Sequence, residues 1–512
     1  MKKLFVLLLA LILCRLPSYA QIWESCGGRF IEDKTNESYL PYESVQEGIG
    51  LNNPTPQPIT AEVYGYRILQ SNNNDIEYCE DAVRTTPIAS ETTNDDVVIT
   101  LGSWESWINE HFTPVMLKSD GTVDYELDRS NQNYKADGIT PSDISNVNYD
   151  GNAMVKIKKF YISVSLEKKN GDPYDGVGTS YVHIKISDQK IDDTFTCYGF
   201  VDSAGNEHDY AYYSMFEGSL DSNNKLRSLK GQTPYLTKTS STQYLRNVES
   251  YAKANGNGWN IDNYALFNAL RLAFVMLSAN TSMYTVYGYS KTTGSITTGE
   301  TSDEAGFIFS GTDSSRNKLY KLGWIEEFVG RNWSLINGIY SPSRAVQSST
   351  YIYSFSFKLQ EPYNDFSLYT LNTTGGKAKT IQNYGSASTQ AVESNLLIPI
   401  GDTYSNYAPS NQSNYGGSQV GATAINIPCC VGGSKDTPNN IGMFSLISIS
   451  ANTNVVGTRL TYLEQPSNSN LLGNQSLNNS FSPSLLGNQL QSIEEEEEQI
   501  NIISTDTMEV DR

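Results

Sequence analysis

The strongest constraint in the sequence is one helical segment, residues 262 to 279, that is apolar on nearly every side. Its apolar residues recur at helical spacing, at Leu266, Leu270, Ala273, Phe274 and Leu277. A helix without a polar face is stable only when other elements cover it all round. Asp262 has a side chain suited to the N-cap and would begin this helix. We therefore expect a chain that folds around a buried core helix.

This segment is not expected to cross a membrane. Its most apolar stretch, residues 265 to 277, is shorter than the roughly 20 residues that span a bilayer. Asn268 and Arg271 also interrupt it. We expect no membrane insertion of the mature chain.

The N-terminal segment, residues 1 to 20, is predicted to be a signal peptide. It holds in order a positive pair, an uncharged apolar run and two small residues: Lys2 and Lys3, residues 4 to 13, and Ser18 and Ala20. This order is typical of a secretory signal. The mature protein is expected to begin at Gln21 and to be extracellular, cell-surface or virion-associated.

The next part of the chain favours strands. Only 18% of the residues are charged, whereas 34 are Tyr and 39 are Gly, a composition that suits strands and turns better than surface helices. Strands are predicted at 63–68, 97–101, 123–128, within 156–167 and at 180–188. After an irregular lead-in at 21–60, we expect a β-rich domain at 61–232.

A second domain is predicted at 233–463. It would begin with a helix at 239–254, continue into the buried helix, and end in short strands and long polar loops. From 464 to 512 the chain is rich in Asn, Ser, Gln and Pro and holds an acidic run at 494–498, which predicts a disordered acidic tail. The expected fold class is α+β, mostly β with some α.

Charge and cysteine usage exclude some partners. A formal net charge of −20 should repel nucleic acid and anionic lipid surfaces. Five cysteines would remain after signal cleavage, namely Cys26, Cys79, Cys197, Cys429 and Cys430. They show no spacing typical of zinc sites. Two disulfides with one remaining thiol, or mostly buried thiols, are both compatible with this count.

The sequence indicates no catalytic residue and no cofactor. The three histidines, His111, His183 and His208, have no partner at a metal-like interval, and no nucleotide-binding or nucleophile motif is present. Asp124, Glu126 and Asp128 would share one face of a strand and could bind Ca²⁺. A solvated strand face explains these acids equally simply.

One polar loop has the composition of a binding surface. Residues 402 to 415 combine Tyr and Asn with Ser and Gly, and Tyr gives a large contact area at a low entropy cost. The candidate ligand-binding residues are Tyr404, Asn406, Tyr407, Asn411, Asn414 and Tyr415. An ordinary polar loop is the alternative interpretation.

Several blocks of sequence resemble a group of phage and prophage tail-associated proteins of gut bacteria. In the first half these blocks are 64–68, 80–83, 102–104, 116–125 and 149–154. In the second half they are 252–256, 323–327, 330–333, 337–338, 432–433, 442–444 and 457–460. The blocks are colinear and extend from about 61 to 463. The predicted signal peptide and the acidic tail depart from the pattern of that group.

The resemblance implies an N-terminal β-rich domain followed by a C-type-lectin-like domain, which is also found in formylglycine-generating enzymes. In such domains two helices and a twisted sheet hold loops that face a ligand. We therefore expect a receptor-binding or adhesin-like protein that recognises a cell-surface carbohydrate or protein. Trp324 and Trp333 would lie in its core. A homo-oligomer is compatible with this interpretation.

A secreted enzyme is the alternative. A glycoside hydrolase needs two carboxylates in a cleft, and Glu326 and Glu327 are the candidate pair, although neighbours on a strand point apart. An oxidase of the formylglycine-generating type would need a paired cysteine site near bound metal. Cys429 and Cys430 are adjacent in sequence, where only strained disulfides form.

Overall fold

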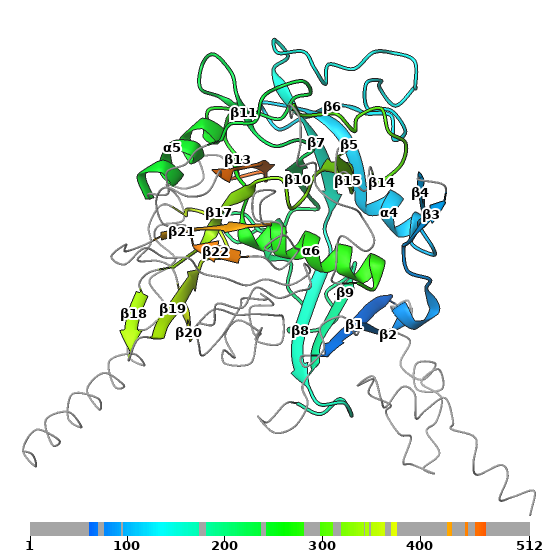
Figure 1. Ribbon diagram of the computed structural model, residues 1–512, viewed down its shortest axis with the longest axis vertical. Helices are drawn as coiled ribbons and strands as arrows, with labels where there is room; N and C mark the ends of the chain where they lie inside the picture. The colour runs from blue at the N-terminus through cyan, green and yellow to red at the C-terminus, as the bar shows by residue number, and fades with distance from the viewer. Residues whose placement is uncertain are drawn as a thin grey trace, which may run out of the picture. The chain divides into compact units, whose positions relative to one another are not determined.

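In the computed structural model, most described elements are strands (Figure 1). The structure describes residues 61–69, 76–93, 96–173, 181–236, 242–280, 297–310, 319–341, 344–347, 350–363, 370–375, 427–432, 446–448 and 456–466. The predicted signal peptide, the lead-in and the chain beyond 466 lie outside these ranges. The described α-helices are α4 (Glu105–His111), α5 (Thr242–Lys253) and α6 (Tyr264–Ser278). The prediction of a mostly β fold with some α is confirmed. None of the described helices is long and apolar enough to span a bilayer.

An antiparallel sheet of four strands is the first large unit, with the order β2-β1-β9-β8. Its strands are β1 (Val63–Leu69), β2 (Ile76–Glu80), β8 (Tyr161–Glu167) and β9 (Tyr181–Ser187). Strands were predicted at the positions of β1, β8 and β9, whereas β2 was not predicted. Tyr66 and Ile184 lie opposite each other in register and belong to the main core. Because side chains alternate along a strand, Arg67 and His183 lie together on the other face.

The second sheet has six strands in the order β13-β24-β10-β7-β5-β6. Its strands are β5 (Phe112–Lys118), β6 (Val123–Glu126), β7 (Gly151–Lys158), β10 (Tyr210–Ser214), β13 (Trp259–Ile261) and β24 (Leu460–Tyr462). β24 comes from the end of the described chain and lies between β10 and β13. Its Tyr462 is in register with both Tyr212 and Trp259.

The predicted boundary at 232/233 does not separate two bodies. Four strands of the six-stranded sheet precede this boundary and two follow it. The main core also combines side chains from both ranges, such as Phe112 and Phe274. The described residues up to Glu464 belong to one compact unit. The two predicted domains merge because strands far apart in the sequence pair with each other. Local sequence patterns do not reveal such pairing.

The third large sheet follows the path β18-β19-β17-β21-β22, with β20 paired to β19 and β23 paired to β17. Its strands are β17 (Trp333–Ser341), β18 (Arg344–Gln347), β19 (Thr350–Phe357), β20 (Thr370–Gly375), β21 (Ile427–Val431), β22 (Leu446–Ser448) and β23 (Val456–Gly457). Short strands form three smaller sheets: β3 (Ala89–Thr93) with β4 (Asp96–Thr100), β11 (Ser219–Leu220) with β12 (Leu226–Arg227), and β14 (Ile308–Ser310) with β15 (Tyr320–Leu322) and β16 (Ile325–Glu326). Single 3₁₀ turns are η1 (Asp81–Arg84) and η2 (Tyr198–Phe200).

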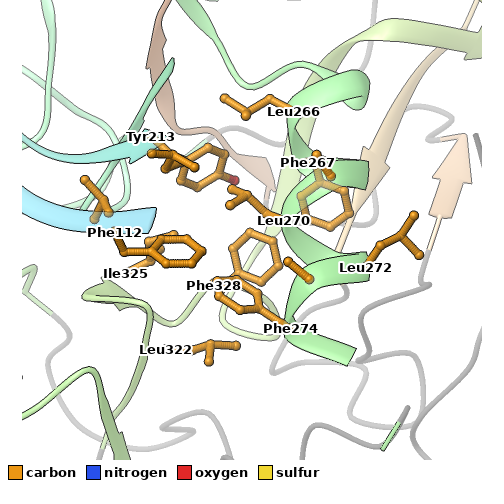
Figure 2. Packing of buried hydrophobic residues seen from close by; sticks show 14 of the residues in the cluster. Phe112, Tyr213, Leu266, Phe267, Leu270, Leu272, Phe274, Leu322, Ile325 and Phe328 are labelled. Carbon is orange, nitrogen blue, oxygen red and sulfur yellow. The ribbon is translucent and has the colours of Figure 1, made fainter. Parts of the chain in front are cut away.

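Helix α6 is the centre of the core, as its sequence predicts. All of its residues are buried, and Figure 2 shows aromatic and aliphatic side chains from several strands packed beside it. Phe267 stacks on Phe328 with ring centroids 5.0 Å apart, and Phe274 stacks on Phe112 at 5.9 Å. The Tyr66 hydroxyl of the first sheet donates to a carbonyl of the helix at 2.9 Å.

The N-cap of α6 is Asn263, so the predicted cap Asp262 is wrong by one residue. The Asn263 side chain accepts from the amide of Leu266 at 2.9 Å. Asp262 instead points into the protein interior and accepts a hydrogen bond from the Tyr213 hydroxyl at 2.7 Å. Both residue types can cap a helix, and tertiary packing selects between them.

Candidate functional site

The predicted loop residues lie outside the described residues. This holds for Tyr404, Asn406, Tyr407, Asn411, Asn414 and Tyr415, so their role stays a prediction.

Two of the acids considered as Ca²⁺ ligands, Asp124 and Asp128, already make contacts within the protein. Lys118 Nζ lies 2.9 Å from a carboxylate oxygen of Asp124. Asp128 lies beyond the end of β6, where its carboxylate accepts from the amides of Ser130 at 2.7 Å and Asn131 at 2.8 Å. Two of the three acids are thus occupied by a cation or by turn amides.

A surface cavity of about 450 Å³ is one candidate for a binding site among the described residues. The turn between β5 and β6, the loop that leads into β10, and the end of β24 together enclose it. Its lining consists of Asp120, Gly121, Thr122, Glu207, His208, Asp209, Tyr210, Tyr212, Tyr462 and Glu464. Aromatic and acidic side chains therefore line the same cavity.

The turn between β5 and β6 supplies one wall of the cavity. Asp120 accepts hydrogen bonds from both the amide and the hydroxyl of Thr122, the amide contact being 2.9 Å. These hydrogen bonds lower the pKa of Asp120 below its ordinary value, so its carboxylate is ionised at neutral pH. Gly121 has a positive φ of 86°, and a Cβ there would lie 1.8 Å from the Tyr462 hydroxyl oxygen. Only glycine lets the turn pack this closely against the tyrosine.

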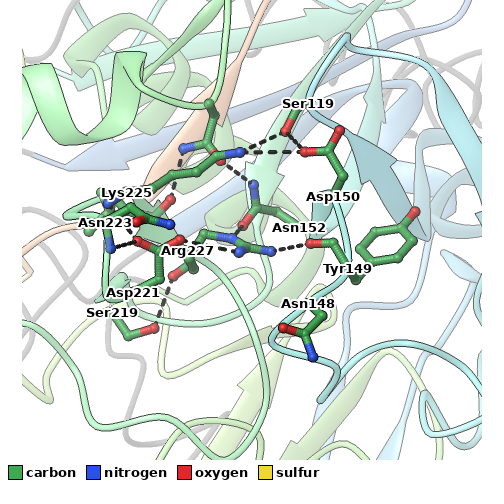
Figure 3. A network of polar contacts seen from close by, with 12 residues as sticks. Ser119, Asn148, Tyr149, Asp150, Asn152, Ser219, Asp221, Asn223, Lys225 and Arg227 are labelled. Carbon is green, nitrogen blue, oxygen red and sulfur yellow. Dashed lines mark hydrogen bonds and ion pairs between the residues drawn. The ribbon is translucent and has the colours of Figure 1, made fainter.

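A polar network fixes the start of this turn (Figure 3). The Ser119 hydroxyl donates to Asp150, and Lys225 Nζ donates to the Ser119 hydroxyl oxygen at 2.9 Å. The indole nitrogen of Trp259 donates to the Ser119 carbonyl at 2.9 Å. Three elements far apart in sequence therefore hold one residue at the rim of the cavity.

The buried Arg227 extends this network below the surface. Its guanidinium donates to the carbonyls of Tyr149 at 2.7 Å and Gly151 at 2.6 Å, as Figure 3 shows in part. Asn152 accepts from the Ser228 amide at 2.8 Å. Because charged donors make the stronger hydrogen bonds, this arrangement keeps the start of β7 rigid beneath the turn.

The tyrosines form the aromatic wall. Tyr212 and Tyr462 meet edge to face with centroids 5.7 Å apart, and Tyr462 also packs at 5.2 Å from Trp259. Tyr210 lies two residues before Tyr212 on the same face of β10 and is 41% exposed. Lys156 Nζ lies 3.7 Å from the centre of the Tyr210 ring. The partly buried Tyr212 and the buried Tyr462 support the wall, and the exposed Tyr210 is available to a ligand.

The acids of the cavity differ in how far they are neutralised. Lys159 Nζ lies 3.2 Å from Glu207 and 3.6 Å from Asp209. His208 Nε2 lies 3.0 Å from the buried Asp202, and its other ring nitrogen lies 3.7 Å from Glu464. The Glu464 side chain is 75% exposed. Asp120 and Glu464 therefore keep carboxylate oxygens that can accept hydrogen bonds from a ligand.

The sequence alone does not predict this cavity. Its residues come from three short stretches, 120–122, 207–212 and 462–464, that no spacing connects. The stretch at 207–212 does combine Tyr with acids and His, which is a composition typical of binding surfaces, as at 402–415. The other two stretches carry no such signal.

The residues considered for catalysis are buried structural groups. Glu326 accepts from the amides of Gly299 at 2.8 Å and Thr301 at 3.0 Å. Arg331 lies 3.7 Å from Glu326 and 3.9 Å from Glu327. Both glutamates are about 2% exposed, so they do not line a cleft open to a polysaccharide.

The adjacent cysteines also lie in the interior. Cys429 belongs to the main core, whereas Cys430 belongs to a second core on the other face of β21. Burial raises the pKa of both thiols, which therefore stay protonated. Cys79 and Cys197 are likewise buried thiols, so no disulfide joins the described cysteines. Cys26 lies outside the described residues.

Two comparisons with known proteins are negative. No family model matches the chain, and no curated protein matches it at a significant level. The resemblance to phage tail-associated proteins therefore stays a prediction.

Proposed function

We propose that this chain is an exported, surface or virion-associated protein of the receptor-binding or adhesin-like kind that recognises a carbohydrate. The observation that carries the proposal is the cavity that joins exposed Tyr210 to the carboxylates of Asp120 and Glu464. A sugar ring can pack its apolar face on a tyrosine, and its hydroxyls can donate to carboxylates. A polar protein ligand would use the same groups, which makes it the alternative.

A C-type-lectin-like arrangement in the second half of the chain is part of this proposal. The presence of helices α5 and α6 beside the sheet around β17 supports this part of the proposal, because such a domain combines two helices with a sheet. Trp324 and Trp333 are both buried, in agreement with the expected core. A rigid core with ligand-binding loops is a common arrangement for recognition.

The enzyme alternative has less support. The carboxylates and thiols proposed for hydrolase or oxidase chemistry are buried in the described structure. The cavity does hold several carboxylates, so hydrolysis of a bound glycan should be measured alongside binding. Binding without turnover is the expected result.

Export is tested on the mature N-terminus. If residues 1 to 20 are a signal peptide, secreted material should begin at Gln21 because signal peptidase cleaves after the small residue at position 20. N-terminal sequencing or intact-mass measurement of protein from the medium checks this. Secreted, folded protein that retains Met1 would contradict the export prediction.

Binding is tested on Tyr210. In a glycan-array or cell-binding assay of the mature chain, Tyr210→Ala should weaken binding about 30-fold. The reason is that a ring at the centre of an interface contributes roughly 2 kcal/mol. Tyr134→Ala is the matched control, because Tyr134 is similarly exposed at 37% and does not line the cavity. Both variants should melt like the parent, since exposed side chains contribute little to stability.

The same assay separates the cavity from the predicted loop. A combined Tyr404→Ala, Tyr407→Ala and Tyr415→Ala variant should keep binding if the cavity is the site. If the loop variant lost binding and Tyr210→Ala bound the ligand as well as the parent does, the binding site would lie at residues 402–415.

A further inference from the structure

Three potential metal ligands meet on the polar face of the four-stranded sheet. Cys79 and Glu80 end β2, and His183 lies on β9, with β1 between them. One ligand atom from each residue lies within 4.8 Å of the other two. Cys79 and His183 are fully buried, and the Glu80 side chain is 11% exposed. Sulfur, nitrogen and oxygen donors therefore converge in an interior position.

Gly65 on β1 makes this convergence possible. Gly65 is in register with Cys79, and a Cβ at Gly65 would lie 1.6 Å from a carboxylate oxygen of Glu80. The missing side chain lets the Glu80 carboxylate cross over β1 and reach His183. Glu80 has a positive φ of 48°, a conformation uncommon outside glycine. The backbone thus holds Glu80 in an unfavourable conformation that aims it at the cluster.

One contact of His183 is of the kind that orients a metal-binding histidine. Its Nδ1 lies 2.9 Å from Glu167, and its Nε2 lies 3.2 Å from Glu80. The Ser165 hydroxyl donates to the same Glu167 carboxylate at 2.6 Å. A carboxylate on one ring nitrogen is the usual way to orient the other nitrogen toward a metal. Two ligands on one tetrahedral zinc with bonds of about 2.0–2.1 Å lie roughly 3.3 Å apart, close to the observed separation of Nε2 and Glu80.

A second group of possible ligands serves as a contrast. Glu110, His111 and Asp188 also lie close together, but Lys158 Nζ contacts both Glu110 and Asp188. An ammonium group already neutralises those two carboxylates. In the described residues around His183, the two carboxylates contact the His183 ring nitrogens and no lysine contact to them is seen, although the buried Arg67 is in register with His183 on the neighbouring strand.

We propose that Cys79, Glu80 and His183 bind one zinc-class divalent ion, with Glu167 as a positioning residue. The ligand set favours zinc, because thiolate and imidazole are poor ligands for Ca²⁺ and Mg²⁺. The bound ion would fasten the end of β2 and η1 to β9, strands that do not pair directly. This role is structural and independent of the carbohydrate cavity.

The test uses the mature full-length chain with Zn²⁺ or Co²⁺ as the only added metal. Native mass spectrometry should show one zinc per chain, and cobalt should give a thiolate-to-cobalt charge-transfer band. Cys79→Ser should remove the band and weaken metal binding at least ten-fold. Cys197→Ser is the matched control, because it alters another buried thiol outside the cluster and should keep both the band and the affinity.

Glu167→Gln tests the positioning role. It should keep the cobalt band but weaken affinity about 10- to 100-fold, as loss of an orienting carboxylate does at other sites. His183→Ala is a poorer choice because it leaves two carboxylates close together and can fail to fold.

Three results would overturn the site: no zinc on the parent protein, a cobalt band that survives in Cys79→Ser, or a disulfide between Cys79 and Cys26. An affinity unchanged by Glu167→Gln would remove Glu167 from the proposal.

Discussion

Asp262→Asn is expected to stabilise the protein at pH 7 by up to about 4 kcal/mol and to have little effect at pH 4. Asp262 is fully buried, and burial raises the pKa of its carboxyl group from 3.8 to about 7, even though the Tyr213 hydroxyl and the nearby Arg459 favour the ionised form. A pKa unit corresponds to about 1.4 kcal/mol.

The sign follows from proton binding in the two states. Between about pH 4 and pH 7 the unfolded chain has released the Asp262 proton, whereas the folded chain still holds it. Stability from this group is therefore complete below about pH 4 and is lost as the pH rises to about 7. Asparagine mimics the protonated carboxyl group and cannot titrate, so the variant should lack this loss.

Urea unfolding of the parent and of Asp262→Asn at several pH values measures the effect. The difference between the two curves isolates Asp262, because other titrating groups are common to both proteins. Parallel curves from pH 4 to pH 8 would mean that Asp262 is ionised in the folded protein and that its neighbours stabilise the charge.

Trp333→Ala is expected to lower the free energy of unfolding by about 3–5 kcal/mol. Trp333 begins β17, is fully buried in the second core and is in register with Val456 of β23. Removing a large aromatic side chain costs its transfer free energy and leaves a cavity that the surroundings fill only in part. Ligand binding should fall only because less protein is folded.

Urea midpoints of Trp333→Ala and of Trp333→Phe, which keeps most of the apolar volume, measure this effect. Trp333→Phe should lose much less stability than Trp333→Ala. A loss below about 1 kcal/mol for Trp333→Ala would show that the site collapses around the smaller side chain.

Local patterns in the sequence were sufficient for the elements that depend on one segment. The apolar residues of 262–279 leave no polar face, so α6 had to be buried whatever surrounds it. The strand-forming residues at 63–68 and the alternation at 180–188 likewise predicted β1 and β9.

Features formed by two segments far apart in the sequence could be seen only in the tertiary structure. Tyr462 joins Tyr212 in one sheet across the expected domain boundary, and that pairing builds the wall of the cavity. Cys79 and His183 show no metal-like spacing in the sequence, yet they meet over Gly65 because β1 pairs with both of their strands. The choice of Asn263 over Asp262 as the cap also depends on a contact with the distant Tyr213. Periodicity within a segment reports which face is buried, but it carries no information about the partner strand, and sites made by strand pairing therefore appear only in the folded chain.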